Sequence, residues 1–234
     1  MQQRLIYAYD IWNEPTNPMF LNASRFGSAE WQFLAQMQYE AYAIAKTLTE
    51  KLPQTPCLRS TDPTLIGVYV LGPSLIFDGN AHMVKVAGDV LQGLVDYKRA
   101  RGYNYWPVDA MTCHVYNTRR YDPTEPSNVG AATDLWGQLL DQCCATLAQY
   151  GMPHPNQPWI TELGYTVDQP YPPYDGTFAY QLVQTTYDEA WNRDNRNINN
   201  VFWYSWNMQQ GGILFNEANG KPSAGFQAVI DHAP

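Results

Sequence analysis

Two short stretches of the chain place a glutamate directly after a run of bulky residues. The first is 9-YDIWNEPTNP-18, where Glu14 follows Asn13 and precedes a proline, and the second is 158-PWITELGY-165, which contains Glu162. Two carboxyl groups in one cleft can divide the work of acid and nucleophile when one stays protonated and the other ionised. Such a pair can hydrolyse a glycosidic bond, with retention at a carboxyl separation of about 5–5.5 Å and inversion at about 6.5–9.5 Å.

The elements around these glutamates decide whether their carboxyl groups can meet. Along the chain, apolar runs typical of strands alternate with segments of helical spacing. Strands are expected at 5–13, 66–73, 108–116, 158–164 and 200–206, and helices at 28–52, 81–101, 131–150, 176–194 and 223–231. This alternation predicts an α/β fold with a parallel sheet covered by helices. Because no glycine-rich phosphate loop follows the first strand, a (β/α) barrel is favoured over a dinucleotide-binding sheet.

Further polar and aromatic residues fall at the ends of the predicted strands. They are Asn13, His114, Tyr116 and Trp206. Barrels and open α/β sheets place their active sites at the carboxyl ends of their strands. A single glutamate at a strand end is more often solvated or salt-bridged, and an Asn-Glu-Pro sequence alone is only a turn. The two glutamates together, with histidine and tyrosine in phase, favour a catalytic pair.

The same motifs, in the same order, resemble the clan A retaining glycoside hydrolases. IWNEP is similar to the acid/base motif that ends barrel strand four of these enzymes, and WITELGY is similar to the nucleophile motif that ends strand seven. VYVLGPS resembles strand five, CHVYN resembles strand six, and VFWYSWN followed by GGILF and GKPSAGF resembles strand eight and the segment after it. The likeness is nearest to family 39 and to family 5-like enzymes, and it covers essentially the whole chain.

The resemblance implies a role for each site residue. Glu14 would be the general acid/base and Glu162 the nucleophile. Asn13 would bond the sugar 2-hydroxyl, Tyr116 would orient the nucleophile, and His114 would line the subsite or, alternatively, only pack near the barrel top. Trp206 or Trp203 would stack under the sugar. Because residues three apart on a regular strand face opposite sides, only one of these tryptophans can do so, and Trp206, nearer the strand's carboxyl end, is favoured.

The resemblance also implies an activity. A retaining β-glycosidase or endo-β-glycanase would act on β-linked glycosides or polysaccharides by double displacement. The alternative is a weakly active or inactive carbohydrate-binding remnant of such an enzyme that forms an oligomer, and a third reading is a purely structural oligomer. The chemistry requires neither a cofactor nor a metal ion. The sugar, and exo or endo action, are not determined by these motifs.

The chain departs from the family because its likeness begins at strand four. About five β/α units, corresponding to strands 4–8, would form an incomplete TIM-type barrel, one partial domain over residues 1–234. The arginine that the family carries on strand two has no counterpart; Arg59 is the nearest candidate, and a surface role is favoured for it. An incomplete barrel leaves open edge strands and apolar surface, which predicts self-association. A truncated reading frame or a piece of a longer product would both fit.

The overall composition and charge argue against some classes of binding partner. The chain is 45% hydrophobic and 15% charged, which predicts a soluble globular domain. Its net charge of −8 and its pI of about 4.8 argue against nucleic acid or an anionic membrane as partner. No apolar run approaches the ~18 residues of a membrane span, and the first residues do not read as a secretion signal, so the localisation stays open.

Cysteine and histidine spacings give no metal-binding pattern. The four cysteines form no CxxC pair, and they are Cys57, Cys113, Cys143 and Cys144. The four histidines show no paired ligand spacing, and they are His82, His114, His154 and His232. The cysteines are expected to be buried thiols, or to form one incidental disulfide.

Overall fold

The structure is a computed structural model that describes residues 8–17, 30–51, 69–121, 125, 127–167, 176–196, 198, 200–204, 215–216, 221–222 and 224–232. Its contacts divide the chain into two compact units. The first unit comprises Met1–Leu75, Lys85–Thr112 and Leu147–Pro155, and the second comprises Ile76–Val84, Cys113–Thr146 and Asn156–Pro234. Each unit is described by itself below.

The first unit is built on two parallel strands and two long helices. Strand β1 (Ala8–Asp10) pairs in parallel with β2 (Tyr69–Leu71), and an isolated parallel bridge joins Leu71 to Ala110. Helix α1 (Glu30–Lys51) packs against β2 through the buried Gln38, whose side-chain amide donates to the carbonyls of Leu71 at 3.0 Å and Pro107 at 3.1 Å. Most of helix α2 (Ala81–Arg101) also belongs to this unit.

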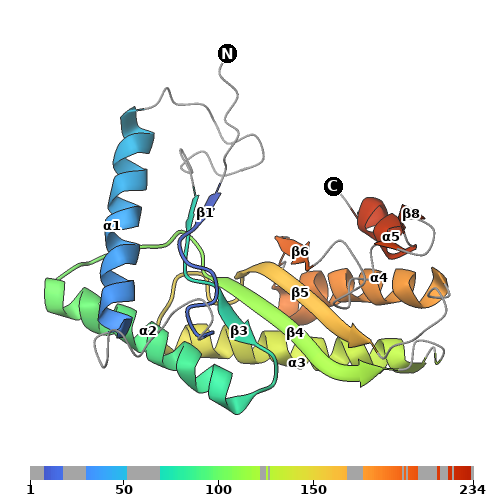
Figure 1. Ribbon diagram of the computed structural model, residues 1–234. Helices are drawn as coiled ribbons and strands as arrows, with labels where there is room; N and C mark the ends of the chain where they lie inside the picture. Colours follow the sequence, from blue (N-terminus) through green and yellow to red (C-terminus); the bar gives the residue numbers. More distant parts are fainter. Residues whose placement is uncertain are drawn as a thin grey trace. The chain divides into compact units, whose positions relative to one another are not determined.

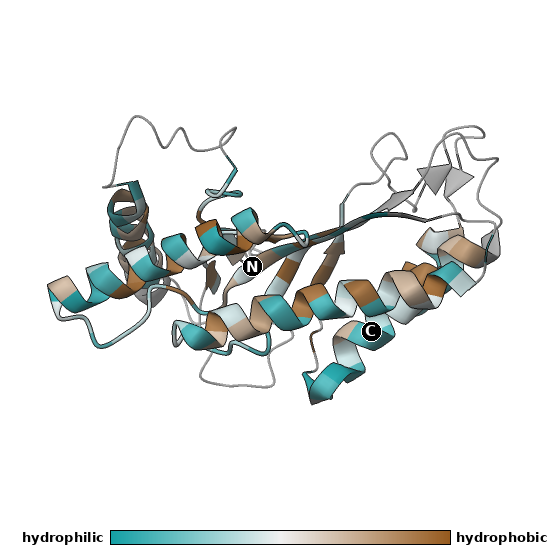
Figure 2. Cartoon of the chain, turned by 90° about the horizontal axis from the view of Figure 1, so that it is seen from below, coloured by the Kyte–Doolittle hydropathy of each residue, from teal (hydrophilic) through white to brown (hydrophobic). Residues whose placement is uncertain are grey.

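The second unit holds a four-stranded sheet backed by helices (Figure 1). The strand order is β3-β4-β5-β6, and the bounds are β3 (Leu75–Phe77), β4 (Thr112–Tyr121), β5 (Trp159–Val167) and β6 (Val201–Trp203). The other elements are α3 (Ser127–Gln149), α4 (Gly176–Asn192), the 3-10 turn η3 (Arg193–Asn195), the antiparallel pair β7 (Phe215–Asn216) and β8 (Lys221–Pro222), and α5 (Ala224–His232). The long helices carry hydrophobic and hydrophilic residues in alternation, as helices with one buried side do (Figure 2).

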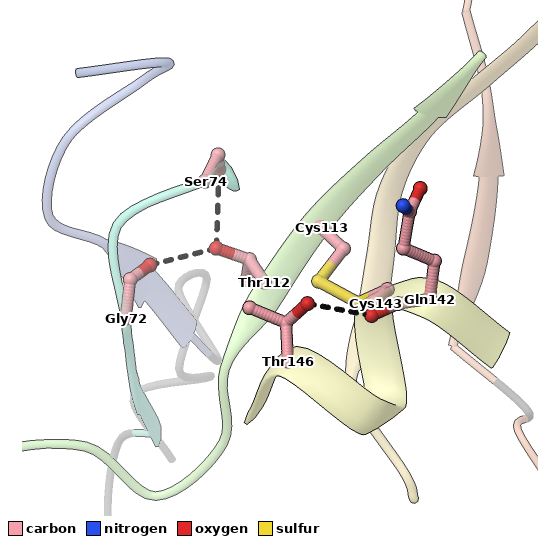
Figure 3. Close-up of a disulfide and its surroundings, with 7 residues drawn as sticks. All are labelled: Gly72, Ser74, Thr112, Cys113, Gln142, Cys143 and Thr146. Atoms are coloured by element: carbon pink, nitrogen blue, oxygen red, sulfur yellow. Dashed lines mark hydrogen bonds between the residues drawn. A yellow bond between two sulfur atoms is a disulfide. The ribbon is translucent and has the colours of Figure 1, made fainter. Parts of the chain in front are cut away.

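Helix α3 fixes which face each residue of β4 presents. Cys113 is joined to Cys143 of α3 by a disulfide (Figure 3). The indole nitrogen of Trp136 donates to the Val115 carbonyl at 3.2 Å, and the Asn117 amide donates to a carbonyl of α3 at 2.8 Å. Because side chains alternate along a strand, His114 and Tyr116 lie on the face of β4 that points away from α3.

Ion pairs tie the end of α4 to α3. The guanidinium of Arg193 binds both carboxylate oxygens of Asp141, with its Nη2 at 2.6 Å, and also contacts Glu189. These hydrogen bonds from Arg193 hold the pKa of Asp141 below its usual value. A Cβ at Gly137 would collide with a Glu189 oxygen, so this helical glycine leaves the space that the Arg193 network occupies.

The disulfide is expected to stabilise the second unit. It closes a segment with a sequence separation of 30, for which the chain-entropy model gives about 3–4 kcal/mol. Reducing the bond should therefore lower the free energy of unfolding by about that amount in denaturant titrations. Burial raises the pKa of the neighbouring Cys144 thiol to about 11, so a Cys144→Ala variant should keep the same response to reductant. Alkylation of Cys113 in the native, oxidised protein would contradict the pairing.

The helices agree with the sequence-based prediction better than the strands do. Helix α2 has the predicted bounds, and α1, α3, α4 and α5 differ from theirs by a few residues where the structure describes them. Within the predicted strand at 66–73 the structure has β2, and a further short strand that was not predicted, β3, follows after Gly72–Ser74. A Cβ on Gly72 would lie 2.6 Å from the Met111 sulfur, so glycine lets the Met111 side chain approach the backbone here. The proline that follows removes a backbone donor from the strand pairing.

Strands β1 and β2 pair in parallel, as do β5 and β6, which is expected for a (β/α) fold, whereas β7 and β8 are antiparallel. The described strands form three separate sheets and do not close into a barrel. Strands β1 and β6 stand at the ends of their sheets in these pairings. Among the described helices, none is both long and apolar enough to span a bilayer.

Candidate active site

Glu162 lies on β5 beside two residues of the neighbouring strand β4. The Tyr116 hydroxyl donates a short hydrogen bond to Glu162 Oε2, and His114 Nδ1 lies 3.4 Å from the same oxygen. The His114 and Tyr116 rings are perpendicular, with centroids 6.3 Å apart. The His114 side chain is 1% exposed and that of Glu162 is 22% exposed. The carboxylate therefore has a fixed orientation yet remains open to a ligand.

Helices pack against one side of the sheet, and this packing determines which side chains of β4 and β5 meet on the other side. On β4, the residues on either side of His114 and Tyr116 are held against α3, so these two rings share the opposite face. On β5, the Tyr165 hydroxyl is within hydrogen-bond distance, 2.7 Å, of Thr186 Oγ1 on α4. Tyr165 therefore faces the helix layer. The register of β5 shifts between Ile160 and Leu163, so it is the contacts of Glu162 with His114 and Tyr116 that place its side chain on the other face.

Tyr204 lies on the same face, and it was not among the site residues predicted from the sequence. Its backbone N–H donates to the Leu163 carbonyl at 2.9 Å, and its exposed ring meets Tyr116 edge to face at 6.1 Å between centroids. Gly164 lies between them: a Cβ there would be 3.1 Å from the Tyr116 ring and 3.3 Å from the Tyr204 carbonyl oxygen. The alternation of VFWYS could have indicated Tyr204, because it follows Trp203 and must face the other side.

Trp203 takes a packing position instead of a place beside Glu162. Its ring stacks on Tyr165 at 5.9 Å and meets Tyr187 of α4 at 6.4 Å between centroids. Burial raises the pKa of Tyr187, in keeping with this enclosed contact. Trp203 pairs with Leu163 in the strand register, which puts it on the helix-facing side. These contacts favour Trp206 over Trp203 for stacking under a sugar, and that role stays a prediction, because Trp206 lies outside the described residues, as does Arg59.

Glu14 occupies an unusual backbone position in the first unit. It is 8% exposed and has a φ of 45°, a left-handed conformation that residues with a Cβ seldom adopt. Pro15 follows, and a residue before proline ordinarily takes an extended conformation. The turn is closed by the Asn17 backbone N–H, which donates to the Glu14 carbonyl at 2.8 Å, and by the Asn17 side-chain amide, which donates to Glu14 Oε2 at 3.0 Å. Strained, buried polar residues of this kind cluster at functional sites.

A buried hydroxyl network supports this turn. The Ser74 N–H donates to the Trp12 carbonyl at 3.0 Å, and the Ser74 hydroxyl makes a short hydrogen bond with Asp10 on β1. Ser74 also lies 3.1 Å from the Thr112 hydroxyl, which donates to the Gly72 carbonyl at 2.7 Å (Figure 3). The sequence did not single out these residues. Asn13, expected to bind a sugar hydroxyl, is exposed just before Glu14.

Backbone strain at Glu14 should have a measurable effect on the free energy of unfolding. A Glu14→Gly variant should be about 1 kcal/mol more stable than a Glu14→Ala variant, because only glycine adopts the left-handed conformation without a steric cost. Denaturant unfolding of both variants measures this difference. The matched pair at the exposed helical residue Glu40 should rank in the reverse order, since alanine is favoured over glycine in a helix. The same order at both positions would contradict the strain.

His114 and Glu162 also offer metal-ligand chemistry. They provide a ring nitrogen and a carboxylate oxygen 3.4 Å apart, on one face of the sheet. A catalytic zinc ion ordinarily takes three protein ligands. The pair provides two possible ligand atoms for a metal ion, and its geometry serves equally well to orient a carboxylate.

Comparisons with known proteins identify a fold. No family model matches the chain, and no curated protein matches it significantly. Among solved structures, the chain is similar to an endo-β-1,3-glucanase of glycoside hydrolase family 128, subgroup II, from Sorangium cellulosum, with a TM-score of 0.52 and 16% identity over 95% of this chain and 68% of that one. This likeness shows a shared fold.

Two further solved structures match at lower TM-scores. A curdlan-specific exo-β-1,3-glucanase of family 128, subgroup III, from Blastomyces gilchristii has a TM-score of 0.49 and 14% identity, over 92% of this chain and 66% of that chain. An intracellular xylanase from Thermoanaerobacterium saccharolyticum has a TM-score of 0.40 and 13% identity, over 94% of this chain and 70% of that chain. The chain thus spans about two thirds of the length of the structures it resembles.

Proposed function

We propose that this chain is a retaining glycoside hydrolase that acts on β-linked glucans, with Glu162 as nucleophile and Glu14 as general acid/base. The observation that carries the proposal is the Glu162 carboxylate, held by Tyr116 and His114 on an accessible sheet face. Burial and strain at Glu14 support its role as the second carboxyl group. The shared fold of an endo-β-1,3-glucanase makes β-1,3-glucan the first substrate to test.

The reaction would proceed in two displacements. Glu162 attacks the anomeric carbon while Glu14 donates its proton to the departing glycosidic oxygen, which gives a glycosyl ester on Glu162. Glu14, now ionised, takes a proton from water, and that water attacks the anomeric carbon and releases Glu162 as a carboxylate. Because Tyr116 binds Oε2 of Glu162, we assign the attack to Oε1. Asn13, adjacent to Glu14, would bond the 2-hydroxyl of the sugar.

A 2-deoxy-2-fluoro glucoside with a good leaving group tests this proposal. The fluorine slows hydrolysis of the glycosyl ester, so the label should accumulate on the peptide that contains Glu162. Product analysis by NMR should show retention at the anomeric carbon. A label on another residue, or inversion of configuration, would refute the assigned mechanism. Glu125→Gln, a change at an exposed carboxylate of the same unit, serves as a control that should label normally.

Gly164 should influence the activity of the same site, because it lies next to the Tyr116 ring. Any Cβ at this position comes within 3.1 Å of the Tyr116 ring, so Gly164→Ala should displace the hydroxyl that orients Glu162. We expect kcat on an aryl β-glucoside to fall roughly tenfold, since small misplacements of a reacting group are costly. The exposed helical glycine at 130, where a Cβ meets nothing within 4 Å, provides the control Gly130→Ala, which should leave kcat unchanged. Equal activity of both variants would count against the role of Tyr116.

A second candidate function is carbohydrate binding without turnover. It is favoured by the exposed ring of Tyr204, which lies beside Tyr116 and offers an aromatic surface to a sugar without taking part in the chemistry. In that case wild type and Glu162→Gln would bind laminarin oligosaccharides equally, and neither would release sugar. We also propose self-association, because β1 and β6 end their sheets and Phe202 and Tyr204 are exposed at the latter. Size-exclusion chromatography with light scattering tests this: a monomer at micromolar concentration would contradict it.

A further inference from the structure

The first unit carries a cluster of five tyrosines that the proposed mechanism does not use. We call it the tyrosine platform, and its members are Tyr39, Tyr42, Tyr97, Tyr103 and Tyr105. Three come from α1 and α2, and two from the loop that follows α2. Tyr103 is 36% exposed and Tyr105 is 38% exposed, so the platform presents two rings to solvent. Their centroids lie 5.3 Å apart.

Each exposed ring is backed by a ring of α1. Tyr103 stacks on Tyr39 with centroids 4.7 Å apart and planes within 23°, and Tyr105 stacks on Tyr42 at 5.8 Å and 26°. Tyr39 is buried, and its hydroxyl donates to the Tyr105 carbonyl at 3.2 Å. Burial and the neighbouring tyrosines raise the pKa of Tyr39 far above its usual value, so this hydroxyl remains a donor. The outer rings are therefore fixed from beneath.

The loop itself is also ordered by the end of α2. Gly102 adopts a φ of 68°, which ends the helix, and its N–H donates to the Arg99 carbonyl at 3.2 Å. The Tyr103 N–H donates to the Lys98 carbonyl at 3.1 Å. A ligand that stacks on Tyr103 and Tyr105 meets rings already in place, so little conformational entropy is lost on binding. Preorganised, exposed aromatic rings of this kind are typical of binding surfaces.

We propose that Tyr103 and Tyr105 form a surface site for a neutral β-glucan chain, additional to the residues assigned to catalysis. A pyranose offers an apolar C–H face to an aromatic ring and hydroxyls at its edge. Asn104, exposed between the two tyrosines, offers an amide to those hydroxyls. The choice of β-glucan as the ligand depends on the proposed function. The proposal that the tyrosine platform binds a ligand depends only on the geometry of its rings.

Charge favours a neutral ligand over a polyanion. The chain carries a net charge of −8, which repels anionic polymers. The nearby cations lie over ring faces, with Lys98 at 4.1 Å from the Trp106 centroid and Arg101 at 5.2 Å from that of Tyr97. Lys46 is paired with Asp109 at 2.6 Å. Single-stranded nucleic acid, which also stacks on aromatic rings, is the competing ligand that the experiment must exclude.

Binding should be measured in the Glu162→Gln background, with insoluble curdlan as the β-1,3-glucan probe and a single-stranded oligonucleotide as the competing one. The double variant Tyr103→Ala/Tyr105→Ala should weaken curdlan binding by roughly tenfold or more. Trp191→Ala, which removes an exposed ring on α4 in the second unit, should leave binding unchanged. Tyr103→Phe/Tyr105→Phe keeps both rings and the fold, and it should retain binding.

Three outcomes would overturn the inference. They are curdlan binding that survives loss of both rings, an equal loss in the Phe double variant, and tighter binding of the oligonucleotide than of curdlan. The outcome is separable from that for the active site. Platform-dependent binding by a chain with no turnover would refute the proposed function and support the platform, whereas turnover with no platform-dependent binding would do the reverse.

Discussion

Replacing Glu162 by glutamine is expected to lower kcat on β-glucosides at least about a thousandfold. Glutamine keeps the shape of the side chain and can still accept the Tyr116 hydrogen bond, so the sheet face should remain intact. It lacks a carboxylate to attack the anomeric carbon, and no glycosyl ester can form. The affinity for oligosaccharides should change little. Residual activity above a few per cent of wild type, after exclusion of contaminating enzyme, would remove Glu162 from the nucleophile's role.

A second variant at the same position separates loss of chemistry from loss of structure. Glu162→Gly leaves space next to Tyr116, and added azide or formate can enter it and attack the anomeric carbon of an activated glucoside. The product of that single displacement has inverted configuration, the opposite of the wild-type outcome. Recovery of activity with inversion would identify the side chain that normally attacks. Glu125→Gln, exposed and outside the site, should show neither the loss nor the rescue.

Replacing Glu14 by glutamine is expected to slow hydrolysis of glucans about 10²–10⁴-fold, the range for loss of a general acid. The effect should depend on the leaving group. A departing sugar hydroxyl needs the proton of Glu14, whereas an acidic phenol departs without it. With an activated aryl glucoside the first step should therefore remain fast, and the glycosyl ester should accumulate because no base activates water. We therefore expect burst kinetics, with rapid initial release of the phenol followed by slow steady-state turnover.

Azide gives the complementary control for Glu14. As a nucleophile that needs no base, azide should accelerate breakdown of the accumulated ester in Glu14→Gln and give a glycosyl azide of retained configuration. The same anion gives inversion when the nucleophile is missing, so the two carboxylates are distinguished by stereochemistry alone. Glu40→Gln, at an exposed position of α1, should behave as wild type. Equal losses for all leaving groups in Glu14→Gln would contradict the acid/base assignment.

Much of the fold could be predicted from local pattern. Helix α2 has the predicted bounds because its apolar residues repeat at helical spacing and glycine ends it. The strand predicted at 66–73 is present as β2, whereas the short strand β3 after Gly72–Ser74 could not be predicted, since it is defined by its pairing with β4, which is distant in sequence. The residues of β4 beyond Tyr116 are polar, so periodicity alone ended that strand too early, whereas backbone pairing continues it to Tyr121.

The candidate site was likewise predictable only in part. The sequence by itself determined that Glu14 and Glu162 follow strand-like runs and that His114 and Tyr116 share one face of a strand, because side-chain alternation is a property of the extended chain. Only the tertiary structure decided that the Tyr116 hydroxyl and His114 meet Glu162, that Trp203 packs on Tyr187 of α4, and that Glu14 is held in a left-handed turn. These features depend on which strand or helix lies opposite, and such contacts between residues distant in sequence leave no periodic signal in the chain.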